Sequence, residues 1–107
     1  MLKKKYRLPV PEVRGRRCVR RAFAYGILTI CPSNLPFPRF AVVVGARVAR
    51  SAAARNALRR FVYQVIQSVW AGLRPCDALI VLAPKAQNAD KKGMRNALDA
   101  LFRPLRK

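Results

Sequence analysis

The residue types that usually carry hydrolytic chemistry are scarce in this chain. It contains no histidine, so the commonest general base is missing. The carboxylates Glu12, Asp77, Asp90 and Asp99 are scattered, and none forms a close pair along the sequence that could hold metal ions. No glycine-rich phosphate loop followed by Lys and Ser or Thr occurs. We therefore expect neither a catalytic residue nor a metal site in the polypeptide, unless distant carboxylates converge in three dimensions.

The cysteines are an unpromising set for metal binding. Cys18, Cys31 and Cys76 are widely spaced and form no C-x-x-C motif. A zinc site would need further ligands, and a disulfide framework would leave one thiol over. We expect all three to be reduced and to pack as small apolar residues.

Arginine is the residue type that the chain supplies for chemistry. The 23 Lys and Arg residues face only four Asp and Glu residues, which gives a net charge of +19 over 107 residues. Because 52% of the residues are hydrophobic, this is a folded domain rather than a disordered basic tail. Such a charge predicts a polyanionic partner, with nucleic acid favoured over an anionic membrane surface. No apolar run is long enough to span a membrane, and no signal-peptide core follows residues 1–7, so we expect a cytoplasmic protein.

The arginines concentrate around a predicted helix within residues 45–72. Ser51 can cap its start and Gly72 can end it. At about 100° per residue, one apolar sector contains Leu58, Phe61, Val62, Val65, Ile66 and Val69. The opposite side carries Asn56, Arg60, Tyr63 and Gln67, and Arg59 lies near the boundary. Arg55 points towards the apolar sector but precedes Leu58, the first apolar residue of that sector.

These helical arginines have no acidic neighbours in the sequence, because no Asp or Glu lies between Glu12 and Asp77. A solvated face is the ordinary interpretation of a helical charge run. Guanidinium groups without local partners are, however, well suited to bind phosphate oxygens. We favour the phosphate interpretation.

The remaining elements predict a single α+β domain. Residues 1–21 are basic and weakly structured, with Pro11 and Glu12 able to start a short helix. Strands are expected within 23–31, over 39–45 antiparallel to it, and over 77–83 buried on both faces; Asp90 can cap a last helix over 91–102 with an apolar stripe of Met94, Leu98, Leu101 and Phe102. The economical arrangement is a two-layer sandwich with the sheet on one side and the helices on the other.

Two ordered motifs carry a resemblance to a known family. The first is the Val-rich strand 39–44, a basic loop with Arg47 and Arg50, and then Arg-Asn-x-x-[Lys/Arg]-Arg over 55–60. The second is the hydrophobic strand that begins at Asp77 and is followed by Pro84. In this order, over about residues 23–102, the chain resembles the protein subunit of bacterial ribonuclease P.

The resemblance implies a fold like that of ribosomal protein S5 domain 2, with an unusual left-handed βαβ crossover through the arginine-rich helix. It implies that a large catalytic RNA removes the 5′ leader of precursor tRNA with Mg²⁺, which the RNA subunit and the substrate mainly hold. The protein would bind that RNA through its Arg-Asn region and hold the leader in a cleft between the sheet and the first helix. The predicted RNA-binding residues are Arg47, Arg50, Arg55, Asn56, Arg59, Arg60 and Tyr63. The predicted leader-binding residues are Phe23, Tyr25, Arg39 and Phe40, with core packing as the alternative role for the aromatic ones.

The chain departs from the family pattern at three places, one of which is the loop between Val48 and Arg55, a residue longer than in many members. The usual Arg-Asn-Arg is Arg-Asn-Ala here, so Ala57 cannot make the contact of the third residue. The first helix of the family usually carries a phenylalanine, where this chain has Pro9 and Pro11. The alternatives are a ribosomal or other structural RNA-binding protein, a DNA-compacting protein and a membrane-active cationic protein. The sequence leaves the oligomeric state open.

Overall fold

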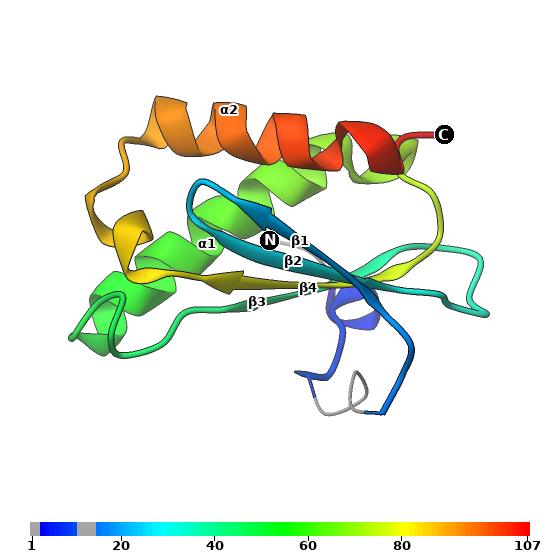
Figure 1. The fold of residues 1–107 in the computed structure, drawn as a ribbon, viewed down its shortest axis with the longest axis horizontal. Helices are drawn as coiled ribbons and strands as arrows, with labels where there is room; N and C mark the ends of the chain where they lie inside the picture. Colours follow the sequence, from blue (N-terminus) through cyan, green and yellow to red (C-terminus); the bar gives the residue numbers. More distant parts are fainter. Residues whose placement is uncertain (1–2, 11–14) are drawn as a thin grey trace.

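The computed structural model describes residues 3–10 and 15–107, and its elements follow the predicted order with one further strand and several short 3-10 helices. The described helices and strands are η1 (Lys4–Tyr6), β1 (Val19–Phe23), β2 (Gly26–Cys31), β3 (Arg39–Val43), α1 (Ala52–Val69), η3 (Trp70–Gly72), β4 (Asp77–Leu82), η4 (Pro84–Asn88), α2 (Lys91–Phe102) and η5 (Arg103–Leu105). Figure 1 shows the two long helices on one side of a single sheet. The α+β two-layer sandwich is therefore confirmed.

The strand order is β1-β2-β4-β3, so the last strand of the sequence lies between β2 and β3. β4 pairs antiparallel with β2, placing Leu28 opposite Ile80, and parallel with β3, placing Val42 opposite the same Ile80. β3 runs antiparallel to β2, as predicted, because β4 is antiparallel to β2 and parallel to β3. The two strands are not neighbours, since β4 lies between them. β3, α1 and β4 form the parallel βαβ unit that the resemblance implies.

β1 is a strand that the sequence did not reveal. Four of its five residues are exposed, and arginines occupy its centre, as expected for a sheet edge protected by charge. It forms a hairpin with β2, with Phe23 opposite Gly26. The hairpin brings Cys18 next to Cys31, and the two form a disulfide. The expectation of three reduced cysteines was therefore wrong for this pair, whereas Cys76 is free and buried.

Both helix starts match their sequence signals. The Ser51 hydroxyl accepts a hydrogen bond from the Ala54 amide at 3.0 Å, and the Asp90 carboxylate accepts one from the Gly93 amide at 2.7 Å. α1 ends at Val69 and continues as η3 to Gly72, while α2 spans the predicted residues 91–102. The stripe of α2 is buried as expected and packs with the middle of α1 in one core: Met94, Leu98, Leu101, Phe102, Val62, Val65 and Ile66.

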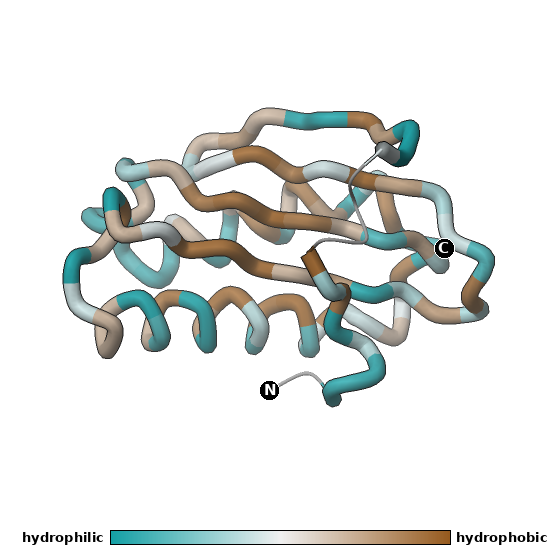
Figure 2. Tube along the Cα trace, turned by 90° about the horizontal axis from the view of Figure 1, so that it is seen from below, coloured by the Kyte–Doolittle hydropathy of each residue, from teal (hydrophilic) through white to brown (hydrophobic). Residues whose placement is uncertain are grey.

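The second face of the sheet carries no long helix among the described residues, and Figure 2 views the molecule from that side. The strands alternate, so Leu28 and Ile80 are fully buried towards the helices while Ile27 and Val81 keep 44% and 40% of their surface exposed. The prediction that the strand over 77–83 is buried on both faces was therefore wrong.

The described N-terminal segment lies along the free edge of β3. The Leu8 amide donates a hydrogen bond to the Phe40 carbonyl at 2.8 Å, and the Tyr6 ring packs against Phe37 and Trp70. Trp70 itself packs against the core, and its indole donates to the Pro38 carbonyl at 3.1 Å. The short helix expected at Pro11 lies outside the described residues. Within the described ranges, no helix is both long and apolar enough to cross a membrane.

Candidate nucleic-acid interface

The loop between β3 and α1 presents two exposed arginines, Arg47 and Arg50. Arg55, on the first turn of α1, holds this loop rather than extending into solvent. Its Nη1 donates hydrogen bonds to the carbonyl of Ala49 at 3.0 Å and to that of Arg50 at 2.7 Å. Arg55 therefore positions the loop, and Arg47 and Arg50 extend from it as exposed side chains.

The following turn of α1 supplies the rest of the predicted interface. Arg59 Nη1 donates to the Asn56 Oδ1 at 2.6 Å, which fixes the direction of a half-buried guanidinium. Arg60 is exposed on the adjacent side of the helix. The Asn56 amide therefore has a physical role beside Arg59 that periodicity alone did not indicate. Together, the loop and these two turns carry Arg47, Arg50, Arg59 and Arg60, which we call the basic surface.

Tyr63 does not belong to this surface, and the prediction that it faces RNA was wrong. Its side chain is 6% exposed, and its hydroxyl accepts a hydrogen bond from the Val42 amide at 3.3 Å. Burial raises the pKa of this phenol above its usual value of 10.0. The physical reason is that α1 lies against the free edge of β3, so the helix is covered over a wider arc than its apolar sector suggests.

The predicted leader-binding aromatic residues face the helices rather than a nucleic acid. Phe40 is fully buried, and its ring meets that of Phe102 edge to face at 5.7 Å. Phe23 and Tyr25 are half-buried and pack against the same core. The leader role is therefore wrong for Phe40, and the rings of Phe23 and Tyr25 are already in use for packing.

Arg39 is held at the other face of the sheet by a buried carboxylate. Asp77 is 1% exposed and accepts hydrogen bonds from Arg39 Nε and Nη2, both at 2.9 Å, and from Arg16 Nη1 at 2.8 Å. Burial by itself would raise the pKa of Asp77, but the bonds and charges of Arg39 and Arg16 outweigh it and lower that pKa below 3.8. Asp77 is therefore an ionised anchor whose oxygens are engaged by two arginines, so it is a poor proton donor and only a weak base at neutral pH.

The thiol next to this anchor is also unreactive. Burial, followed by the negative charge of Asp77, raises the pKa of Cys76 to about 11. A protonated thiol is a poor nucleophile and a poor metal ligand. Among the described residues, no three His, Cys, Asp or Glu side chains lie together where they could hold a metal ion.

A second basic region lies on the open face of the sheet, and sequence reasoning missed it. A hollow of about 440 Å³ there is lined by Val10, Gly15, Arg16, Cys18, Arg20, Thr29 and Leu79. Arg16 also donates to the Pro32 carbonyl, which ties the segment before β1 to the end of β2. The alternation of side chains along Val19–Phe23 was the available signal, because it places Arg20 on the face that points away from the helices.

The chain matches the model of the Ribonuclease P family over residues 12–106. It belongs to the ribonuclease P protein family. No match was found among the curated proteins.

Solved structures of bacterial ribonuclease P proteins have the same fold. A Staphylococcus aureus RNase P protein mutant with defective mRNA degradation activity has a TM-score of 0.86 at 14% identity, covering 94% of this chain and 88% of that one. The Thermotoga maritima RNase P protein has a TM-score of 0.81 at 16% identity, covering 94% and 98%. The Thermotoga maritima protein in complex with 1-(4-fluorophenyl)-2-thiourea has a TM-score of 0.73 at 19% identity, covering 80% and 84%. At these identities the likeness shows the shared fold.

The position of the Arg-Asn motif in the fold agrees with the resemblance found in the sequence. The motif occupies the first turns of α1, directly after the basic loop, as the resemblance implies. The position of the family's usual second arginine is Ala57, an exposed residue on the same helix.

Proposed function

We propose that this chain is the protein subunit of a ribonuclease P holoenzyme in the cytoplasm, where it binds a catalytic RNA and precursor tRNA. One observation carries the proposal: a ribonuclease P protein fold presents a basic surface, free of acidic side chains between residues 13 and 76, at the start of its longest described helix. A duplex-compacting or membrane-active protein would not need the hydrogen bond by which Asn56 orients the Arg59 guanidinium.

The proposed contact to the RNA subunit is electrostatic and directional. Arg47, Arg50 and Arg60 are exposed cations, and Arg59 is oriented by Asn56, so each can reach a phosphate without first breaking an ion pair that the described structure records. Neutralised phosphates release counterions, so binding should weaken steeply as salt is raised. This surface positions RNA; it supplies no group for cleaving it.

The proposed site of the chemistry is the RNA, with the Mg²⁺ ions held mainly by the RNA subunit and the substrate. The residues described here support this division of labour. Asp77 is held by two arginines, and the Asp90 carboxylate caps α2. A metal-binding polypeptide would be expected to keep carboxylates free and close together.

The open face of the sheet is the proposed path of the 5′ leader. Arg16 and Arg20 line its hollow and can bind phosphates, while Ile27 and Val81 offer apolar surface to unpaired bases on the same face. This assignment replaces the aromatic leader site proposed from the sequence, because Phe40 lies on the opposite face of the sheet.

The decisive experiment is cleavage of precursor tRNA by the RNA subunit encoded in the same genome, with and without this protein. We expect the protein to lower the Mg²⁺ concentration needed for half-maximal cleavage, because its cations screen the repulsion between two RNAs. A structural RNA-binding protein would bind the same RNA and leave the Mg²⁺ requirement unchanged. That result would refute the proposed function.

A further inference from the structure

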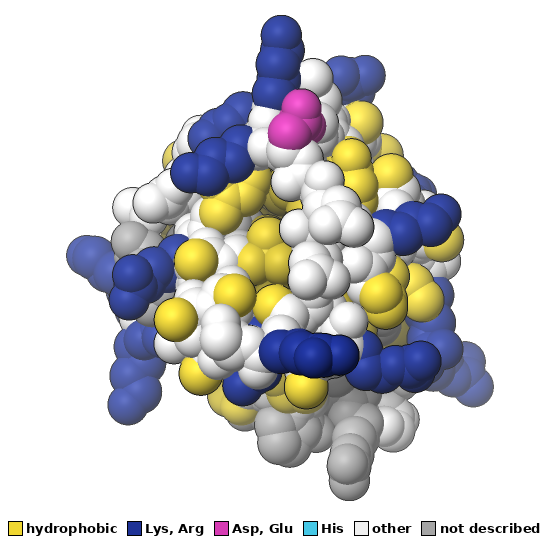
Figure 3. Space-filling view, turned by 90° about the vertical axis from the view of Figure 1, so that its left-hand side faces the viewer, with side chains coloured by type: hydrophobic (Ala, Val, Ile, Leu, Met, Phe, Trp, Pro, Cys, Tyr) yellow, Lys and Arg dark blue, Asp and Glu magenta, His cyan; other side chains and the backbone are white. Residues whose placement is uncertain are grey.

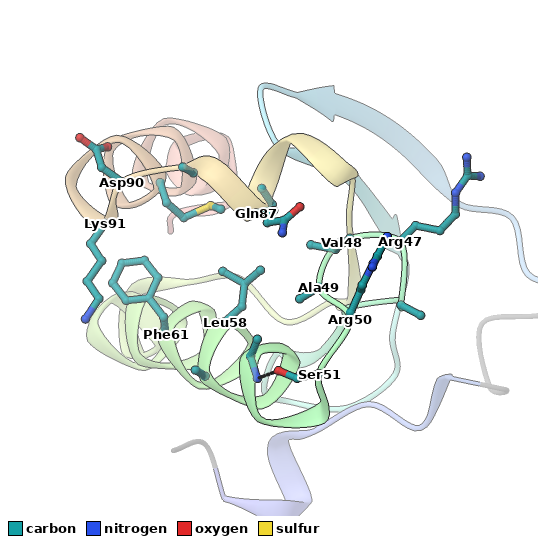
Figure 4. A pocket seen from close by; sticks show the side chains of 16 residues that line it. Arg47, Val48, Ala49, Arg50, Ser51, Leu58, Phe61, Gln87, Asp90 and Lys91 are labelled. Atoms are coloured by element: carbon teal, nitrogen blue, oxygen red, sulfur yellow. Dashed lines mark hydrogen bonds between the residues drawn. The ribbon is translucent and has the colours of Figure 1, made fainter.

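A large groove lies at the end of the molecule where α1 and α2 begin. It has a volume of about 920 Å³, within the range of roughly 300–1,000 Å³ that small-molecule sites occupy. Its walls come from the β3–α1 loop, the first half of α1, η4 and the first turn of α2. Figure 4 shows Leu58 and Phe61 projecting from α1 into this space, opposite Gln87.

The interior of the groove is apolar and only partly filled by the protein. Leu58 and Phe61 belong to the apolar sector of α1, yet both stay half-buried because α2 covers only part of them. Met94, which is 1% exposed, lies beside them at the groove. The Arg95 guanidinium lies over the Phe61 ring at 5.7 Å, so this wall combines an aromatic surface with a cation.

Ala57 keeps the groove open. It lines the groove from an exposed position on α1, at the place where the family pattern has a second arginine. Leu58 and Phe61 line the same groove, so a longer side chain at this position would occupy part of the space beside them. The small methyl group leaves that surface accessible.

The rim of the groove is basic at both ends. Arg47 and Arg50 lie at the loop end, and Lys91 lies at the other end beside Phe61 (Figure 4). The one acidic lining residue, Asp90, uses its carboxylate to cap α2. Figure 3 faces this side of the molecule and shows apolar side chains in a hollow surrounded by Lys and Arg.

A flat apolar group with a negative charge on either side fits this combination. We propose that the groove binds one unpaired nucleobase of a single-stranded RNA segment against Leu58 and Phe61, close to the buried Met94. The phosphates on its two sides would bind Arg47 and Arg50 at one end and Lys91 at the other. The inference rests on the proposed function, since it takes RNA as the partner. An apolar peptide would match the walls but not the cations at both ends.

The test uses the full-length protein and two RNA pentanucleotides, one with 2-aminopurine at the centre and one with an abasic central position. We expect the wild type to bind the first about 5- to 150-fold more tightly, the range that stacking of one base contributes. We also expect the 2-aminopurine fluorescence to fall and the Met94 methyl resonance to shift on binding. Equal affinities with no Met94 shift would overturn the proposal.

The variant that closes the groove is Ala57→Met, and its matched control is Ala100→Met, at an exposed position of α2 that does not line the groove. Ala57→Met should reduce the preference for the base to less than about threefold, and Ala100→Met should leave it unchanged. Thermal unfolding of both variants checks that the fold is intact. A base preference that survives in folded Ala57→Met would also overturn the proposal.

The same preparations separate this inference from the proposed function. Wild-type protein that supports cleavage of precursor tRNA, yet shows no base preference, refutes the groove and leaves the ribonuclease P assignment intact. Protein that shows the base preference without lowering the Mg²⁺ requirement supports the groove as a site for another RNA and refutes the assignment.

Discussion

Replacing Asp77 with asparagine should lower the free energy of unfolding by about 2–3 kcal/mol at neutral pH. The substitution keeps the size of the side chain but removes its charge, and one acceptor becomes an NH₂ group that faces guanidinium nitrogens. Removing one partner of a buried ion pair costs about 3–5 kcal/mol. Here the side chains of Arg39 and Arg16 keep 16% and 28% of their surface exposed, so water can replace part of the missing interaction. For a domain of this size, the melting temperature should fall by about 10–20 °C.

The loss of stability caused by Asp77→Asn should become smaller in acid, because the pKa of Asp77 is lower in the folded state than in the unfolded state. The carboxylate has a pKa below 3.8 in the folded state and near 3.8 in the unfolded state. Its contribution is therefore fully present above 3.8 and is lost as the pH falls through the lower folded value. The stability difference between wild type and Asp77→Asn should be constant between about pH 5 and 7 and shrink in stronger acid.

Thermal unfolding followed by circular dichroism measures both quantities, with Asp99→Asn as the control for a change of one charge. Asp99 is half-buried on α2 and should contribute less than about 1 kcal/mol. If Asp77→Asn melted within a few degrees of wild type at neutral pH, the anchor would not hold the open face of the sheet together. A difference that did not change in acid would refute the ionised state of Asp77.

Three further variants test the basic surface and the buried positions of Phe40 and Tyr63. The double change Arg59→Ala and Arg60→Ala should reduce the salt-dependence slope of RNA-subunit binding by about 0.7–0.9 for each phosphate that the protein no longer neutralises; an unchanged slope would contradict the phosphate role. Phe40→Leu should cost about 1–2 kcal/mol of stability through weaker packing against Phe102, yet leave the ratio of precursor to mature tRNA affinity in the holoenzyme unchanged. Tyr63→Phe should cost about 1–2 kcal/mol, because the buried Val42 amide loses its acceptor; chemical denaturation would show no change in stability if water replaced it.

The sequence determined the features that depend on neighbours along the chain. A cap such as Ser51 or Asp90 bonds an amide three residues away, so its position is visible in the sequence and both helix starts were predicted. The excess of arginine over acidic residues likewise needs no fold to indicate a polyanionic partner. The same applies to Arg47, Arg50 and the Arg-Asn motif, which are ordered along a single loop and helix.

Only the tertiary structure decided which surfaces these elements leave open. Strand order depends on pairing between distant segments, and the insertion of β4 between β2 and β3 made β3 an edge. Helical periodicity places Tyr63 on the polar side of α1, yet the edge of β3 covers it. Among the described residues, the Val42 amide has no neighbouring strand at this edge, and the Tyr63 hydroxyl accepts its hydrogen bond instead. Alternation along β3 places Phe40 and Arg39 on opposite faces of the sheet, but it does not say which face meets the helices. In the folded protein Phe40 packs against Phe102 on the helix side, and Arg39 bonds Asp77 on the other side. Cys18 and Cys31 meet for the same reason, since their pairing follows from the register of the β1–β2 hairpin and not from their spacing.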